Sequence, residues 1–342
     1  MNQKPLLTIA IPNYNGGENL KRALYSIKYI KLPLDEFEIL LVDNHSTDNS
    51  IDIIYSFREI FPNIRLFQNR TNIGRVENWN RCLELANGKY LLFLFTNDEL
   101  HSKNEIHKAI DILEKIPKVS LVFGDIFYMY GKKKMIAPNY TIEFYGELKD
   151  YVKKTFLDLK NFGSFLVLQQ QIIRTEIIKK HQIRFISKYP RTTDRVFTFN
   201  VISNGTGCFY YIPNTFTIWH LTPYRFHFQV HENPFVDPDL LWMNELWANR
   251  YILQRSGFDE KIIFLNFINY FILLLLNYLI KFKIHNLKHW FWGCKYLAKI
   301  YTKIPSLTRS DYFWLIRNFY ITLIRRIELK IFRKRLYKKL FT

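Results

Sequence analysis

The chain has 342 residues, 48% of them hydrophobic and 17% aromatic, so it is long and apolar enough to build a large buried core, which excludes a disordered polypeptide. The formal net charge is +19, and much of it lies in residues 281–342, which hold 16 Lys and Arg against two acidic residues. The three cysteines, Cys82, Cys208 and Cys294, are odd in number and lack metal-binding spacing, which favours a reducing compartment over a disulfide-stabilised secreted domain.

The start of the sequence also bears on location. Only about six apolar residues follow Met1–Pro5, too few for the core of a secretory signal peptide. We therefore expect a cytoplasmic protein.

Strand and helix patterns alternate along the first part of the chain. Short apolar runs predict strands at Leu6–Ile11, Ile39–Val42, Ile64–Phe67, Tyr90–Phe95 and Val119–Phe123. Apolar residues at helical spacing predict intervening helices around Leu20–Ile27, Ile51–Phe57, Arg75–Ala86 and Asn104–Leu113, the second of them capped from Ser46, Thr47 or Asp48. This alternation predicts an α/β fold over residues 1–225, with a mostly parallel, Rossmann-like sheet flanked by helices. Ligands of such sheets bind outside the carboxyl ends of the strands.

Polar side chains follow four of the predicted strands. Together they offer a carboxylate and amides for a base and ribose, a cation for phosphate and a second carboxylate for a divalent metal. The candidates are Pro12, Asn13, Tyr14 and Asn15, then Asp43 and Asn44, then Asn72, Gly74 and Arg75, then Asn97 and Asp98. Taken singly, Asp43 and Asp98 could begin helices and Arg75 could be an exposed helix residue. Their convergence at one sheet edge predicts a nucleoside-diphosphate site.

Four segments resemble the family 2 glycosyltransferases: Leu7–Asn15, Glu38–Asp48, Asn69–Arg75 and Asn87–Leu94. The resemblance covers roughly residues 5–225. It implies the glycosyltransferase A fold, a nucleoside-diphosphate-sugar donor and a base-binding role for Asp43.

The resemblance also implies a metal ligand. The family's Asp-x-Asp motif reads Thr96-Asn97-Asp98 here, so its first Asp is missing and its last is kept as Asp98. Oxygen ligands of this kind suit Mg²⁺ or Mn²⁺. His220 follows a strand that the family often ends with a His near the diphosphate, and it is either a metal or phosphate contact or a His packed beside Trp219.

By the same resemblance, Asp194 is the general base of an inverting transfer. An acceptor hydroxyl is a poor nucleophile until its proton is being removed, and a positioned base is worth about 10²–10⁴-fold in rate. The alternative is that Asp194 only caps a helix after Thr192-Thr193. Asp125, after the Val119–Phe123 strand, is a candidate contact to the donor sugar or the acceptor.

Apolar residues at helical spacing and an excess of Lys and Arg predict a helical, basic C-terminal region over residues 226–342. Ile262–Ile280 contains no charge, which by length fits a membrane span, but Asn266, Asn269 and Asn277 form one polar stripe on a helix. Burial against the catalytic domain or docking in a bilayer interface is therefore favoured over spanning. The basic residues farther on suit an anionic membrane surface, at about 1 kcal/mol per nearby basic side chain, although a merely solvated basic face has the same composition.

The resemblance implies transfer of a sugar to a glycan or lipid-linked glycan acceptor in surface polysaccharide synthesis, and with the basic tail it places the expected enzyme at the inner face of a bacterial membrane. A dinucleotide-dependent oxidoreductase shares the strand–helix alternation, but its Gly-x-Gly-x-x-Gly turn is absent from residues 12–17. The basic tail leaves a membrane or nucleic-acid adaptor as a rival, although no nucleic-acid partner is expected. A second rival is a catalytically degenerate transferase, because Thr96 replaces the first Asp of the Asp-x-Asp motif.

Overall fold

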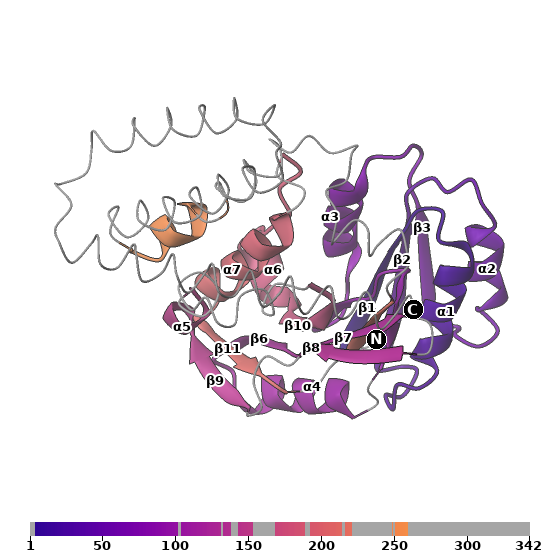
Figure 1. Cartoon of the computed structure of the whole chain (residues 1–342). Helices are drawn as coiled ribbons and strands as arrows, with labels where there is room; N and C mark the ends of the chain where they lie inside the picture. Colours follow the sequence, from indigo (N-terminus) through magenta and orange to yellow (C-terminus); the bar gives the residue numbers. More distant parts are fainter. Residues whose placement is uncertain are drawn as a thin grey trace, which may run out of the picture. The chain divides into compact units, whose positions relative to one another are not determined.

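A computed structural model of the chain describes residues 4–101, 104–130, 133–137, 143–152, 168–188, 192–213, 216–220, 248 and 250–258 (Figure 1). The chain divides into two compact units, Met1–Leu148 with Ser164–Phe226, and Lys149–Gly163 with His227–Thr342. The first unit holds the strands described below. In the second, the structure describes the end of the short helix α5 (Leu148–Val152) and the segment around residues 248–258.

The main sheet of the first unit has eight strands in the order β3-β2-β1-β4-β10-β6-β11-β9. Their bounds are β3 (Ile64–Gln68), β2 (Phe37–Asp43), β1 (Leu7–Asn13), β4 (Tyr90–Phe93), β10 (Gln171–Arg174), β6 (Val119–Phe123), β11 (Cys208–Tyr211) and β9 (Phe144–Glu147). β1 pairs in parallel with β2 and β4, β2 with β3, and β6 with β11. β10 and β9 run antiparallel to their neighbours. The mostly parallel sheet predicted from the sequence is confirmed.

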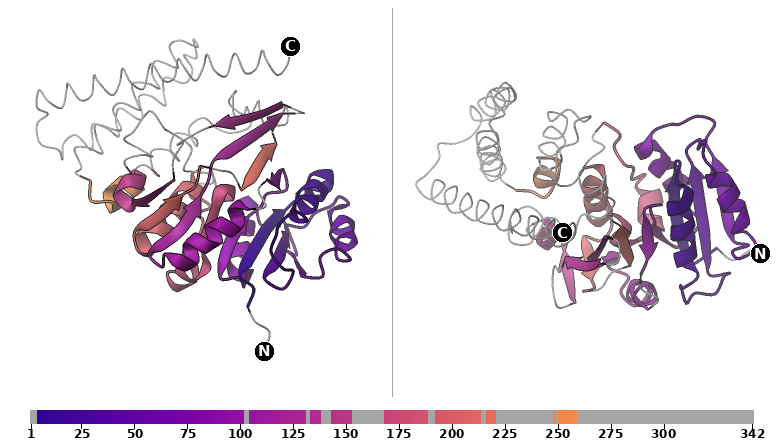
Figure 2. Two further views of the ribbon diagram at one scale, coloured as in Figure 1. Left: turned by 90° about the horizontal axis from the view of Figure 1, so that it is seen from below. Right: turned by 45° about the vertical axis from the view of Figure 1, so that its right-hand side comes forward.

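Helices cover both faces of this sheet (Figure 2). They are α1 (Gly17–Ile27), α2 (Ser50–Ser56), α3 (Arg75–Leu85), α4 (Glu105–Lys115), α6 (Thr175–Lys180) and α7 (Thr193–Asn204). Every residue of β1 and β2 is buried, as expected for central parallel strands with both faces covered. α1 buries Leu20, Leu24 and Ile27 along one side, which is the helical spacing seen in the sequence.

A second sheet of four strands, in the order β5-β12-β7-β8, was not predicted. Its strands are β5 (Asp98–Leu100), β12 (Thr217–His220), β7 (Ile126–Tyr130) and β8 (Lys133–Ala137). The reading of Asp98 as a residue that begins the next helix is wrong, because β5 pairs with β12 and α4 begins only at Glu105. Strand partners from distant parts of the chain override a helix-start pattern this short.

Two local predictions are also corrected. The predicted strand Tyr90–Phe95 ends at Phe93, as β4. The N-cap of α2 is Asn49, not a residue of Ser46–Asp48. Ser46 is unavailable as a cap because its hydroxyl and amide contact Asp43.

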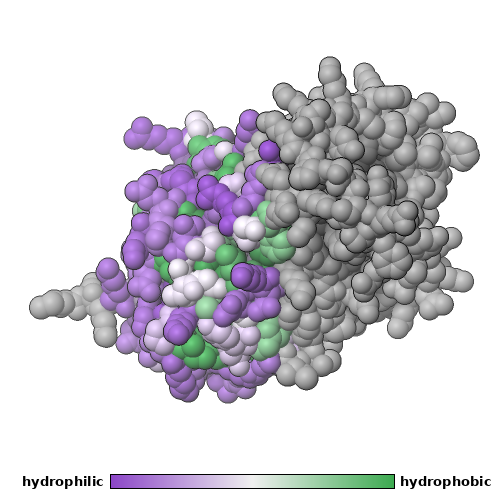
Figure 3. Space-filling view, turned by 90° about the vertical axis from the view of Figure 1, so that its left-hand side faces the viewer, coloured by the Kyte–Doolittle hydropathy of each residue, from purple (hydrophilic) through white to green (hydrophobic). Residues whose placement is uncertain are grey.

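Within the described part of the chain, no helix combines the length and apolarity that a bilayer crossing requires. Ile262–Ile280 and residues 281–342 lie outside the described residues, so their predicted docking and membrane binding stay predictions. On the face shown in Figure 3, the described surface is mainly hydrophilic, with small separate apolar areas.

Candidate active site

β1 and β2 end side by side, at Asn13 and Asp43, which are partners in the parallel register. Asp43 is fully buried, and its carboxylate accepts hydrogen bonds from Asn13 Nδ2 (2.7 Å) and from the backbone N of Ser46 (3.0 Å). Such donors replace the water that a buried carboxylate has lost. Since α2 is capped elsewhere, Asp43 is not a helix cap, and it is held rigidly at the carboxyl edge of the sheet.

The loop after β1 is bound to the loop after β2. Asn15 donates its backbone N–H to Ser46 Oγ (2.9 Å), and its side-chain Oδ1 accepts from the backbone N of Thr47 (2.8 Å). Tyr14 beside it is half exposed. Pro12, expected in this loop, instead lies inside β1 opposite Val42.

The same loop also meets the segment after β4. A Cβ added to Gly16 would lie 3.2 Å from the Thr96 side chain and 2.3 Å from Asn13 Oδ1, so this close approach requires glycine. Three of the four predicted loops are thereby in contact.

The fourth loop, before α3, is fixed by asparagine side chains. Asn44 Nδ2 donates to Asn72 Oδ1 (2.7 Å), and Asn44 Oδ1 accepts from the backbone N of Ile73 (3.0 Å). Asn72 Oδ1 also accepts from the backbone N of Gly74 (2.9 Å), which precedes the helix with a φ of 83°. Because a positive φ suits glycine, these contacts define where α3 begins next to the end of β2.

Arg75 is the first residue of α3, and its guanidinium lies over the Trp79 ring, 5.1 Å from the ring centroid. Solvent reaches the side chain, yet the surrounding protein lowers the pKa of Arg75 by desolvation, and the negative charge of Asp194 opposes that shift. Arginine keeps its charge at neutral pH. The positively charged guanidinium of Arg75 therefore lies near the edge formed by the β1 and β2 loops.

Asp194 is the second residue of α7 and is half-buried. Thr192 is the N-cap, so the reading of Asp194 as a cap is not what the structure shows. Its Oδ1 accepts from the backbone N of Arg195 (2.9 Å), and its charge acts on Arg75. The first turns of α3 and α7 thus bring a guanidinium and a carboxylate into electrostatic reach.

Asp98 is fully buried at the start of β5, where its backbone N donates to Phe95 O (2.9 Å) and closes a turn. Asn97 precedes it, and its backbone O accepts a long bond from Arg22 Nη2 (3.4 Å). Among the residues that the structure describes, no three His, Cys, Asp or Glu side chains gather as a metal site. A cation here would need oxygens from a bound diphosphate besides Asp98.

His220 lies beside Glu99, with Nε2 3.1 Å from Oε1. Contact with this imidazole is the main cause that lowers the pKa of Glu99, and the charge of Arg22 adds to it. The β5–β12 register pairs Asp98 with Trp219, and directly paired residues share a face of a sheet. His220 therefore lies on the face of Glu99, whereas Asp98 lies on the other face, and the two predicted metal contacts do not meet as a pair.

The profile of the family described as Glycosyl transferase family 2 matches residues 8–204, more than half of the chain. The chain belongs to glycosyl transferase family 2.

Its relatives and structural neighbours agree with this assignment. A poly(ribitol-phosphate) beta-glucosyltransferase of Bacillus spizizenii is 26% identical over 57% of this chain and 29% of that protein. The poly(ribitol-phosphate) beta-N-acetylglucosaminyltransferase TarP of Staphylococcus aureus is 24% identical over 72% of this chain and 68% of that protein. The chain spans less than a third of the length of several curated relatives.

Among solved structures, S. aureus TarS 1-349 in complex with UDP-GlcNAc superposes with a TM-score of 0.66, at 18% identity, over 86% of this chain and 81% of that chain. At that identity the likeness shows the fold, which is the glycosyltransferase A type.

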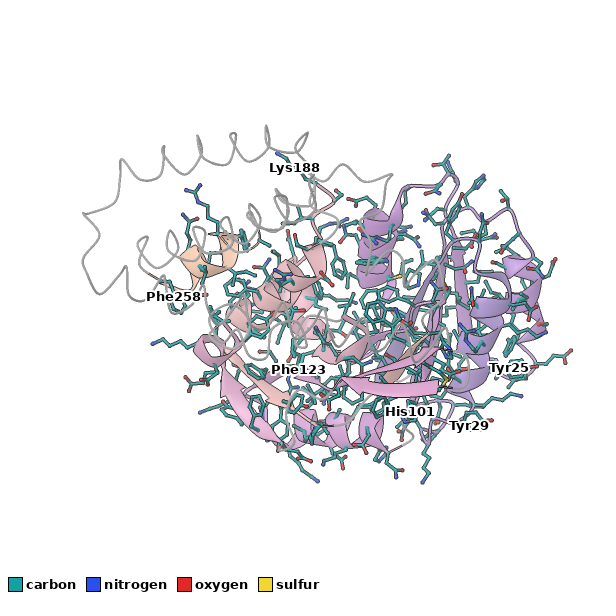
Figure 4. All side chains as sticks on the ribbon, in the orientation of Figure 1. Tyr25, Tyr29, His101, Phe123, Lys188 and Phe258 are labelled. Carbon is teal, nitrogen blue, oxygen red and sulfur yellow. The ribbon has the colours of Figure 1, made fainter. Side chains whose placement is uncertain are left out.

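Two further groups in this family 2 chain lie near the strand ends. Asp125 follows β6, whose last residue Phe123 is labelled in Figure 4, and it accepts a hydrogen bond from the Tyr211 hydroxyl (2.6 Å). Its predicted contact to a sugar stays a prediction.

Arg22 was missed, because a cation on an amphipathic helix looks like any exposed basic residue until the fold brings it to Asn97 and Glu99.

Proposed function

We propose that this family 2 protein is an inverting glycosyltransferase that moves a sugar from a nucleoside-diphosphate-sugar to an acceptor hydroxyl. The observation that carries the proposal is that Arg75, at the start of α3, lies next to loops that are bonded together around the buried Asp43, with the charge of Asp194 acting on its guanidinium. A transferase needs these three groups within one small region: an acceptor for the base and ribose, a cation for the diphosphate and a proton acceptor for the incoming hydroxyl.

The donor is bound at the joined loops. Asp43 and the exposed amide of Asn15 face the nucleoside, with Tyr14 beside them and Asn97 on the neighbouring loop. Arg75 binds the diphosphate, where a guanidinium donates two parallel hydrogen bonds to phosphate oxygens. Asn72 and Gly74 support it by fixing the start of α3.

Asp98 would hold a divalent cation, Mg²⁺ or Mn²⁺, with the remaining ligands supplied by diphosphate oxygens. Such an ion supplies positive charge that stabilises the departing nucleoside diphosphate. His220 would contact a phosphate of the donor rather than the ion at Asp98, because it lies on the opposite face of the β5–β12 pair, and its pairing with Glu99 orients the imidazole.

Asp194 removes the proton of the acceptor hydroxyl as that oxygen attacks the anomeric carbon. The charge of Asp194 acts on Arg75, so the proposed proton acceptor and the proposed diphosphate-binding cation lie in the same region of the site.

The acceptor is a hydroxyl of a surface polysaccharide or a lipid-linked glycan. Support comes from the two poly(ribitol-phosphate) transferases, which act on a polyol polymer by name. The enzyme works in the cytoplasm at the inner face of the membrane, where residues 281–342 bind anionic lipid, and it has no nucleic-acid partner.

The test is a screen of UDP-, GDP- and dTDP-sugars for donor hydrolysis and for transfer to membrane-extracted acceptors, with Mg²⁺ or Mn²⁺ present. Turnover of one donor by the wild-type chain, and none by an Asp194→Asn chain, is the expected result. No turnover of any donor would support the rival reading of a degenerate transferase, which the Thr96 substitution favours.

A further inference from the structure

Helix α3 carries Arg75 in its first turn and is tied, one and a half turns later, to the segment that leads into α7. Asn80 is 2% exposed, and its Nδ2 donates to Phe185 O (3.0 Å) while its Oδ1 accepts from Phe185 N (2.8 Å). One side-chain amide thus pairs with both polar groups of one backbone residue. Buried backbone groups bonded in this way strongly define the position of a segment that has no strand or helix partner.

Phe185 and the residue after it contact α7, so the position of this segment also affects the position of α7. Its ring stacks on Phe197 of α7, with centroids 4.1 Å apart. The next residue, Ile186, donates its backbone N–H to the hydroxyl of Thr193, which is the first residue of α7 and directly precedes Asp194. The described stretch ends at Lys188, labelled in Figure 4.

The same segment reaches the donor side through aromatic contacts. The Trp79 and Phe185 rings pack at a steep angle, with centroids 5.3 Å apart, and the Arg75 guanidinium lies over the Trp79 ring. Residues 79 and 80 of α3 therefore hold Phe185 from two directions. The proposed phosphate-binding residue and the proposed base are linked through this one residue.

Exposed ion pairs join the same two elements at the surface. Arg184 lies 2.7 Å from Glu84 and 3.7 Å from Glu77, and all three side chains are substantially solvent-exposed. Exposed ion pairs contribute only about 0–1 kcal/mol to stability, so they do little to fix the position of a segment. The buried amide of Asn80 is therefore the main polar contact between α3 and the segment that leads into α7.

We propose that Asn80 is a positioning residue that sets the position of Asp194 relative to the donor diphosphate. The inference rests on the proposed function, because it requires Asp194 to be the base and Arg75 to bind phosphate. Asn80 acts through Phe185 and Thr193 and touches neither reacting group. A displacement of a catalytic group by about 1 Å costs on the order of 10²-fold in rate, so a change at Asn80 acts on kcat.

The test compares Asn80→Ala and Asn80→Asp in the full chain. The Ala variant loses both bonds to Phe185, and the ionised Asp variant keeps the acceptor but cannot donate to Phe185 O. We expect kcat to fall about 10- to 100-fold in both variants, using the donor sugar that the wild-type chain turns over fastest. KM for that donor and Kd for its nucleoside diphosphate stay within about 2-fold, since the loops that bind it do not contact Asn80. Glu84→Gln, which removes an exposed pair between the same elements, is the matched control and keeps wild-type kinetics.

A second readout does not depend on activity. Amide hydrogen exchange over residues 183–197 should be faster in both Asn80 variants than in the wild type and unchanged in Glu84→Gln. If the Ala variant does not fold, the Asp variant decides by the same two measurements.

The outcomes separate the two proposals. A wild-type chain without turnover overturns the proposed function and this inference with it. Wild-type turnover with unchanged kcat in folded Asn80 variants overturns this inference alone. An equal loss of kcat and of nucleotide affinity also overturns it, because that result marks a general structural role.

Discussion

The carboxylate of Asp194 and the guanidinium of Arg75 are electrostatic neighbours, although they belong to the first turns of two different helices. Desolvation by the surrounding protein lowers the pKa of Arg75, and the negative charge of Asp194 opposes that shift. A guanidinium and a carboxylate that act on each other in this way suit the proposed reaction, in which a hydroxyl attacks a sugar whose leaving group is a diphosphate.

Replacing the proposed base should separate chemistry from donor binding. Asp194→Asn keeps the size of the side chain but cannot accept the hydroxyl proton, so kcat should fall by about 10²–10⁴-fold. Kd for the nucleoside diphosphate, measured by calorimetry, should change less than about 3-fold. Asp111→Asn on the exposed side of α4 is the control and should leave both quantities unchanged. Turnover near the wild-type level in Asp194→Asn would remove Asp194 from the mechanism.

Changes at Arg75 should act on donor affinity. Arg75→Ala removes charge-assisted bonds worth about 1.5–3 kcal/mol, so Kd for the nucleoside diphosphate should rise about 10- to 100-fold. Arg75→Lys should recover only part of this affinity, because an ammonium lacks the planar fork of a guanidinium and its packing on Trp79. Arg81→Ala tests a cation on the same helix whose partner is the exposed Glu84, and it should bind the nucleotide normally. Equal affinities in the two Ala variants would contradict the role of Arg75.

Metal dependence should be measurable despite Thr96. If Asp98 holds a cation together with diphosphate oxygens, a strong chelator should abolish turnover, and Mg²⁺ or Mn²⁺ in excess should restore it. Asp98→Asn should lower activity and raise the cation concentration needed for half-maximal rate. Activity that is unchanged by chelation would mean that the diphosphate charge is stabilised by protein cations alone.

The parallel strands were predictable because β1 and β2 are buried throughout and appear in the sequence as continuous apolar runs ending at polar residues. The site loops followed from that alternation, since the carboxyl ends of parallel strands share an edge. Short strands escaped prediction. β5 has three residues and begins with two acids, so its identity as a strand depends on pairing with β12, far away in the chain.

The hydrogen bonds and ion pairs that connect the elements of the site also could not be predicted from the sequence. Asn44 and Asn80 look like ordinary polar residues, and only the folded chain shows that they bond to Ile73 and Phe185. The same holds for the Glu99–His220 pair, because the β5–β12 register decides that His220 faces Glu99 while Asp98 faces away.

The strand β10 was not predicted from the sequence, and neither were the contacts of its last residue. This antiparallel strand lies between β4 and β6 and ends at the buried Arg174. Arg174 Nε donates to Val119 O (2.7 Å), and Nη2 donates to Leu113 O and, at 3.3 Å, to Ile116 O. One side chain therefore bonds to a carbonyl in the last turn of α4, to the carbonyl of its C-cap and to the first carbonyl of β6.

Arg174→Met should destabilise the fold without a direct effect on the site. The substitution keeps much of the apolar stem but leaves buried carbonyl groups without a donor, at about 1–3 kcal/mol for each unsatisfied group. We expect the free energy of unfolding, measured by urea titration, to fall by about 2–4 kcal/mol, and Kd for the nucleoside diphosphate to stay unchanged at low temperature. Lys180→Met, at an exposed position of α6, is the control and should shift stability by less than about 0.5 kcal/mol. A wild-type unfolding midpoint in Arg174→Met would mean that water replaces the guanidinium at these carbonyls, so that the junction of α4 and β6 does not depend on Arg174.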